Sequence, residues 1–216
     1  MKSVLVTGGT VRLGKAIAER LRTEGWRVIT SSHRADAGAD IVADLAEPRS
    51  AARLYAAALQ MLGGMPPDAL VNNAALFTGD AATITAVNLG APKKLTMLMA
   101  GRETGVGAVV NILDTKALDA SRHLPTSIDA YLVSKRELAA FTRSSAATFA
   151  ATLRVNGVAP GPVMAPTDVH EKAGEMLLDR RPTADDVASA VSYLLSAEAT
   201  TGVVIPVDAG QHLVAQ

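Results

Sequence analysis

The chain contains no cysteine, and this absence excludes several kinds of chemistry. None of its 216 residues can form a disulfide, act as a thiolate nucleophile or supply a sulfur ligand to zinc. Its four histidines are scattered, without the spacing of a metal-ligand set: His33, His123, His170 and His212. We therefore predict no metal site.

Excess charge and long apolar runs are also absent. The 21 basic residues balance 21 acidic residues, so there is no electrostatic reason to expect nucleic acid or a membrane surface as a partner. No apolar run reaches the roughly 18 residues that a membrane span requires. An apolar strand pattern beginning at Ser3 leaves no room for a signal peptide. We expect a cytoplasmic protein.

The composition that remains, with 49% apolar residues, suits one folded domain over residues 1–216. Short apolar segments predict strands at residues 3–7, 27–31, 40–43, 69–73, 108–113, 153–158 and 203–207. Helical patterns lie between them, at residues 13–24, 48–62, 84–99, 128–149 and 184–195. This alternation predicts a doubly wound α/β fold around a parallel sheet. Ligands of such folds bind beyond the carboxyl ends of the strands.

Two of the predicted helices have signals at their starts. Pro48 is expected in the first turn of its helix, and Thr183 with Asp186 three residues later resembles a capping box.

The first strand is followed by the loop TGGTVRLG, residues 7–14. Free backbone N–H groups at the start of the next helix suit a pyrophosphate, although a purely structural glycine turn has the same appearance. We expect cofactor contacts from five residues of this loop: Gly8, Thr10, Arg12, Leu13 and Gly14.

The end of the second strand favours NADPH over NADH. A carboxylate usually follows this strand in NAD-preferring sites, whereas this chain has Ser32, His33 and Arg34, which suit a phosphate dianion. Asp36 lies close enough to complicate this assignment, and Arg34 could simply be solvated.

Residues after the third and fourth strands complete the expected cofactor site. Asp44 and Leu45 are placed to contact the edge and face of an adenine. Asn73 and Ala74 follow the fourth strand, where a small side chain lets a cofactor pass closely, although buried asparagines can also simply tie loops together.

The helix after the fifth strand contains YLVSK, with Tyr131 and Lys135 on one face at i and i+4. A neighbouring ammonium lowers the pKa of a phenol, which would make Tyr131 a usable general acid. Such pairs also occur by chance on solvated helices, so the placement after the fifth strand is what strengthens the interpretation.

These motifs, in this order, resemble the short-chain dehydrogenase/reductase family over nearly the whole chain. Further segments carrying the resemblance are AVNLGAP around Asn88, VNGVAPGPV at 155–163 and TGVVIPVDAG at 201–210. The resemblance implies a Rossmann fold with a central parallel seven-stranded sheet and hydride transfer from a nicotinamide. It implies Tyr131 as proton donor, Lys135 as ribose ligand, and Asn88 in a helix irregularity and a water-mediated proton relay. Pro160 and Gly161 would border the nicotinamide.

Three departures from the general family resemble its pteridine reductase branch. Arg12 stands where most members have glycine, Asp114 stands where most have a catalytic serine, and Phe77 follows the NNA motif closely. The branch implies that an aromatic residue stacks a pterin against the nicotinamide. Phe77 can supply a stacking face, and Arg12 can bridge cofactor phosphate and substrate. Asp114 can position Tyr131 or help protonate a ring nitrogen.

Alternatives remain for each of these residues and for the function. Phe77 could be ordinary pocket lining, Arg12 a phosphate contact alone, and Asp114 the cap of a turn. An NADPH-dependent reductase of ketones or of acyl-carrier 3-oxo substrates is a second candidate function, and a non-catalytic NADP(H) sensor is a third.

The chain also departs from typical family spacing. The helices after the second and fourth strands are expected to be shortened, and the interval between Asp114 and Tyr131 is longer than usual. Ser121 or Ser127 could therefore supply the missing hydroxyl. Residues 164–177 predict a short substrate lid. The resemblance also implies a homotetramer or homodimer through the helices after the fourth and fifth strands.

Overall fold

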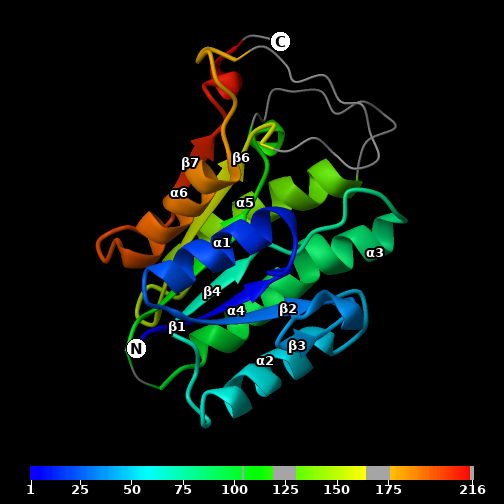
Figure 1. Cartoon of the computed structure of the whole chain (residues 1–216), viewed down its shortest axis with the longest axis vertical. Helices are drawn as coiled ribbons and strands as arrows, with labels where there is room; N and C mark the ends of the chain where they lie inside the picture. Colours follow the sequence, from blue (N-terminus) through cyan, green and yellow to red (C-terminus); the bar gives the residue numbers. More distant parts are fainter. Residues whose placement is uncertain (104, 119–129, 164–175, 215–216) are drawn as a thin grey trace.

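A computed structural model describes residues 1–103, 105–118, 130–163 and 176–214. In this part of the chain, seven strands form one parallel sheet in the order β3-β2-β1-β4-β5-β6-β7 (Figure 1). They are β1 (Ser3–Thr7), β2 (Arg27–Ser32), β3 (Ile41–Val42), β4 (Ala69–Asn72), β5 (Gly107–Ile112), β6 (Leu153–Pro160) and β7 (Val204–Val207). The predicted doubly wound α/β fold with a central parallel seven-stranded sheet is confirmed.

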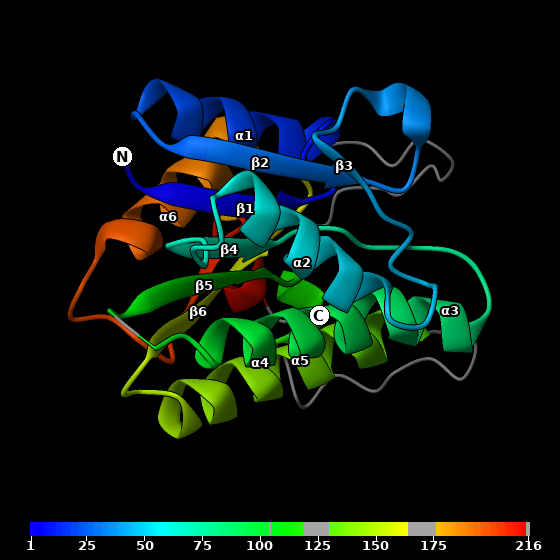
Figure 2. The same ribbon diagram turned by 90° about the horizontal axis from the view of Figure 1, so that it is seen from below.

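Helices cover both faces of this sheet. Figure 2 shows α1 (Arg12–Thr23) and α6 (Ala184–Ser196) on one face, and α2 (Ser50–Met61), α4 (Ala91–Ala100) and α5 (Ala130–Thr148) on the other. Alternation along β1 explains the two layers, because Val4 and Val6 pack in the cluster with α1 and α6. Leu5 between them packs with α2 and α4. Both faces are covered, so the strand is continuously apolar, as the sequence indicated.

The helix starts confirm one of the two predicted signals. Thr183 and Asp186 form a capping box at the start of α6, each side chain accepting from the backbone N–H of the other. The prediction for Pro48 is wrong, because α2 begins only at Ser50. Arg49, with a φ of 66°, interrupts the helical backbone between them.

The connection after β2 has the shortened form that the spacing predicted, whereas the helical segment after β4 covers the whole range expected for it. Between β2 and β3 there is only the 3₁₀ turn η1 (Ala35–Ala37). After β4, the short helix α3 (Ala81–Thr85) runs through the π-helical turn η2 (Ala86–Gly90) into α4. The helix expected at 84–99 therefore starts earlier and contains an irregularity around Asn88. None of the helices in the described residues has the length and apolarity needed to cross a bilayer.

Candidate active site

A cavity of about 650 Å³ lies at the carboxyl ends of the strands. It spans the switch in strand order between β1 and β4, where ligands of doubly wound sheets bind. Every residue predicted to contact the cofactor lines this cavity, from Gly8 after β1 to Gly161 after β6. The folded chain therefore brings together residues from six separate segments, as the positions after the strands indicated.

The loop after β1 is held tightly against the loop after β4. The Asn73 amide donates to the carbonyl oxygens of Thr7 and Gly8, at 2.9 and 3.1 Å. The Thr7 hydroxyl accepts from the backbone N–H groups of Asn73 and Ala74. A Cβ at Gly14 would lie 2.0 Å from the carbonyl oxygen of Gly8, so only glycine fits there. These contacts fix the position of the start of α1.

The start of α1 has the features of a phosphate site. Within the described residues, the buried hydroxyl of Thr10 has no hydrogen-bond partner, and no side chain caps the first N–H groups of α1. Unpartnered donors at a helix N-terminus favour an anion. The residues present therefore fit the diphosphate of a dinucleotide.

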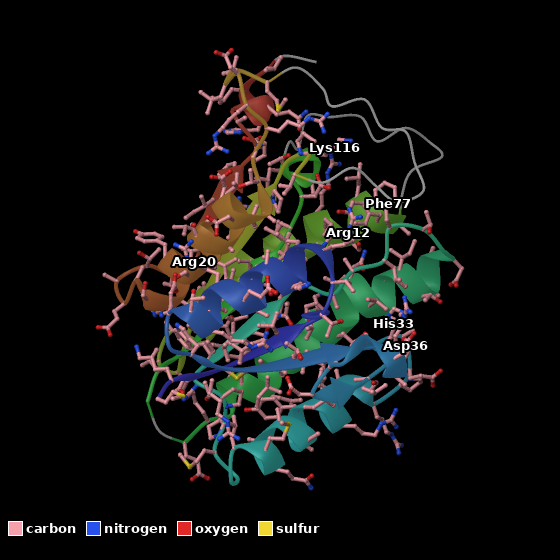
Figure 3. The ribbon with its side chains drawn as sticks, in the orientation of Figure 1. Arg12, Arg20, His33, Asp36, Phe77 and Lys116 are labelled. Atoms are coloured by element: carbon pink, nitrogen blue, oxygen red, sulfur yellow. The ribbon has the colours of Figure 1, made fainter. Side chains whose placement is uncertain are left out.

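Arg12 lines the cavity at this point and has a φ of 49°. Left-handed backbone is the region in which glycine is favoured and other residues are strained. Figure 3 shows Arg12 and Phe77 on the same side of the molecule. The backbone thus explains why glycine is common here, and the strain at a non-glycine residue is typical of functional positions.

The end of β2 lines another part of the cavity with Ser32, His33 and Arg34. Arg34 is paired with Asp36: its Nε donates to Oδ1 at 3.0 Å and its Nη2 donates to Oδ2 at 2.7 Å. The hydrogen bonds and the charge of Arg34 lower the pKa of Asp36. Asp36 therefore does complicate the assignment of a phosphate site, because Arg34, the predicted phosphate ligand, already pairs with the Asp36 carboxylate.

The predicted catalytic residues meet on the other side of the cavity. One turn of α5 separates Tyr131 from Lys135, and the Tyr131 hydroxyl donates to Oδ2 of Asp114 at 3.0 Å. The Lys135 ammonium donates to the carbonyl oxygen of Ile112 at 2.7 Å and lies 5.8 Å from the centroid of the Tyr131 ring. Burial lowers the pKa of Lys135 to about 8, and the charge of Asp114 opposes this shift.

Asp114 makes two contacts at once. Its Oδ1 accepts from the backbone N–H of Lys116 at 2.8 Å, capping the short turn after β5, while Oδ2 accepts from Tyr131. The two interpretations of Asp114, as turn cap and as partner of Tyr131, are therefore compatible. The cap fixes the carboxylate that the phenol contacts.

Phe77 lies against Tyr131, although it is not itself part of the cavity lining. Their ring centroids are 4.8 Å apart at an interplanar angle of 60°, and Phe77 is 51% exposed. A large, half-exposed aromatic ring beside the predicted proton donor offers a face to a flat ligand.

Asn88 is buried in η2 and does not line the cavity. Its side chain accepts from the backbone N–H of Leu76 at 2.7 Å and donates to the carbonyl oxygen of Leu76 at 2.9 Å. It also donates to Ser134 on α5 at 3.1 Å. Asn88 therefore ties the segment that carries Phe77 to the helix that carries Tyr131. Its part in a proton relay stays a prediction.

Several residues of the site were missed or cannot be placed. Sequence reasoning missed Ser134, whose position inside YLVSK was the available signal, and apolar lining residues such as Val87, Leu113 and Val163. Ser121, Ser127 and most of the predicted lid at 164–177 lie outside the described residues.

Comparison with known proteins agrees with this geometry. The family model described as enoyl-(acyl carrier protein) reductase matches residues 11–212. Protein FixR of Bradyrhizobium diazoefficiens is 31% identical, over 98% of this chain and 87% of its own length. Ketoacyl reductase 2 of the granaticin polyketide synthase of Streptomyces violaceoruber is 32% identical, over 97% of this chain and 95% of its own length. Pteridine reductase 1 of Leishmania tarentolae is 29% identical, over 97% of this chain and 96% of its own length.

Among solved structures, the FolM alternative dihydrofolate reductase 1 of Brucella canis in complex with NADP superposes with a TM-score of 0.85. It is 32% identical, and the match covers 100% of this chain and 96% of that one. The match to the family model spans nearly the whole sequence, and the Tyr131–Lys135 pair, the glycine loop and the seven-stranded sheet stand in their expected places. The chain therefore belongs to the short-chain dehydrogenase/reductase family of oxidoreductases.

Proposed function

We propose that this chain is an NADPH-dependent reductase of a pterin-like substrate, with Tyr131 as the proton donor. The observation that carries the proposal is the hydrogen bond between Tyr131 and Asp114, made beside the exposed ring of Phe77. Two similar proteins, a pteridine reductase and an alternative dihydrofolate reductase, support the same substrate class.

The cavity fits NADPH as the cofactor. The start of α1 and Thr10 would hold its diphosphate, Asp44 and Leu45 its adenine, and Arg34 with Ser32 and His33 its 2′-phosphate. Lys135 and Tyr131 would contact the nicotinamide ribose, with Pro160 and Gly161 bordering the ring. When bound, the cofactor supplies a hydride to the substrate.

The protein's own residues supply the proton. Tyr131 lines the cavity, and its hydrogen bond to Asp114 holds the phenol oxygen in position; its one O–H proton turns from Asp114 to the substrate when it is transferred. Lys135 is held by the carbonyl oxygen of Ile112, so that its ammonium stays close to the phenol. A proton from Tyr131 can then reach a ring nitrogen next to the carbon that is reduced.

The substrate side suits a flat heterocycle with donor groups on its edge. Phe77 offers a stacking face, Arg12 offers a guanidinium from the opposite loop, and Asp114 can accept hydrogen bonds. An aspartate cannot donate the hydroxyl hydrogen bond with which a serine polarises a ketone, and this difference favours a pterin over a ketone.

Reduction of a ketone or an acyl-carrier 3-oxo group is the second candidate function. The 32% identity to a ketoacyl reductase over 97% of the chain favours it. The two functions use the same cofactor and the same Tyr131 and differ in the substrate alone, so only a comparison of substrates separates them.

The test is NADPH oxidation by the purified protein against oxidised pterins, dihydropterins, ketones and 3-oxoacyl thioesters. Tyr131→Phe serves as the inactive control and should keep most of the wild-type affinity for NADPH, since it loses only one hydroxyl contact to the ribose. Turnover of pterins that is lost in Tyr131→Phe supports the proposal. Turnover of ketones or thioesters alone would replace it with the second candidate, and tight NADPH binding without any turnover would favour a sensor.

A further inference from the structure

Asp36 lies beside the part of the cavity assigned to the 2′-phosphate but is not part of its lining. It sits within η1, between Arg34 and Ala37, which both line the cavity. Figure 3 shows His33 and Asp36 close together on the turn after β2. The carboxylate therefore stands next to the basic residues that were predicted to receive a phosphate.

The contact between Arg34 and Asp36 uses one full edge of the guanidinium. Nε and Nη2 donate to the two carboxylate oxygens, at 3.0 and 2.7 Å. A phosphate dianion binds arginine through the same kind of two-point contact. Both side chains are well exposed, 61% for Arg34 and 70% for Asp36, so the pair can open without unfolding the turn.

We propose that Asp36 is a specificity-determining residue that competes with the 2′-phosphate of NADPH for Arg34. By occupying the guanidinium when no phosphate is bound, Asp36 reduces the preference for NADPH over NADH. This inference rests on the proposed function, since it assumes that the cavity binds the dinucleotide in the orientation given above.

Local charge points in the same direction. The positive charge of Arg34 is partly offset by Asp36, so an incoming dianion gains less from this part of the rim than it would from an unpaired arginine. The carboxylate itself also repels a phosphate placed on the same guanidinium. Removing the negative charge should therefore favour the phosphorylated cofactor on both counts.

The opposite role, in which Asp36 orients Arg34 for the phosphate, is less well supported. The turn is held by other contacts, because the backbone N–H of Arg34 donates to the Ser32 hydroxyl at 3.1 Å. Exposed ion pairs fix side chains weakly and are screened by salt. Asp36 therefore adds little order to Arg34, whereas its negative charge repels a phosphate on the same guanidinium whether or not the ion pair is closed.

The experiment measures binding of 2′,5′-ADP and 5′-AMP, which differ only in the 2′-phosphate, by calorimetry at one pH and ionic strength. Asp36→Asn should bind 2′,5′-ADP about fivefold more tightly than the wild type, with the affinity for 5′-AMP unchanged. Arg34→Ala should weaken 2′,5′-ADP about tenfold or more. In the Arg34→Ala background, Asp36→Asn should give a smaller gain than in the wild type.

Glu19→Gln is the matched control. Glu19 pairs with Lys15 on α1, with both side chains about as exposed as those of Arg34 and Asp36, and neither residue lines the cavity. Glu19→Gln removes one negative charge from the surface and should leave the affinities for both nucleotides unchanged. An equal gain in this control would assign the effect to net charge and overturn the role of Asp36.

The remaining outcomes separate this inference from the proposed function. Weaker or unchanged binding of 2′,5′-ADP by Asp36→Asn, with normal binding by the wild type, overturns the competition alone. If the wild type binds neither nucleotide, the cofactor assignment fails, and the inference about Asp36 fails with it.

Discussion

Arg12 combines a backbone conformation that lowers stability with a position in the lining of the cavity. A non-glycine residue with a φ of 49° carries backbone strain of about 1–2 kcal/mol. Its side chain lines the cavity, where it can contact both a phosphate and a substrate. The strain is explained if that side chain has a function that glycine cannot perform.

Asp114 is the residue at which substrate choice can be tested. Asp114→Ser replaces the acceptor of the Tyr131 hydroxyl with the hydroxyl group that most of the family has. Because the carboxylate no longer positions the phenol, kcat/KM for pterins should fall about 10²-fold, while kcat/KM for ketones should rise. Steady-state kinetics on both substrate classes check this. An equal change for both classes would show that Asp114 does not select the substrate.

The lowered pKa of Lys135 predicts that kcat/KM depends on pH. Burial lowers its pKa to about 8, so the ammonium is present below that pH and is lost as the pH rises through it. If the charged form is needed beside Tyr131, kcat/KM should fall on the alkaline side with an apparent pKa near 8. A pH–rate profile measures this. A flat profile well above that pH would exclude Lys135 as the controlling charge.

At the scale of single elements, the start of α6 tests the link between local sequence and stability. The Thr183 side chain accepts from the backbone N–H of Asp186 in the capping box. Thr183→Ala leaves that donor unsatisfied and should lower the free energy of unfolding by about 1 kcal/mol, whereas Thr183→Ser should have little effect. Denaturant unfolding of the three proteins measures the difference. Equal losses of unfolding free energy in both variants would show that the hydroxyl of the cap does not contribute to stability.

The elements also show what the sequence could predict. Strands and the residues that follow them were predictable, because continuous apolar runs and chain order place Gly8, Asn73 and Asp114 at one edge of the sheet. The start of α2 was not, since it depends on the positive φ of Arg49 and not on Pro48.

Side-chain conformations were the other limit of prediction. The pairing of Arg34 with Asp36 and the contact of Asn88 with Ser134 depend on rotamers that residue spacing does not specify. The motifs therefore indicated which residues share the site, while the structure was needed to show which of them touch.

At the scale of the whole molecule, we expect a homodimer or homotetramer through α4 and α5. Met97 on α4 and Val133 on α5 are 49% and 45% exposed, which suits an apolar contact between copies. Light scattering should give a mass of two or four chains, and the double variant Met97→Asp/Val133→Asp should give a smaller mass. A wild-type monomer would contradict this prediction.

The central claim is that the cavity reduces a pterin in preference to a carbonyl compound. The most direct measurement gives the wild-type protein equal concentrations of a dihydropterin and a 3-oxoacyl thioester with limiting NADPH, and quantifies both products. Their ratio equals the ratio of the two kcat/KM values. We predict that the reduced pterin dominates by about tenfold or more, a difference that corresponds to about 1.4 kcal/mol in the transition state. A predominance of the reduced thioester would contradict the proposed substrate.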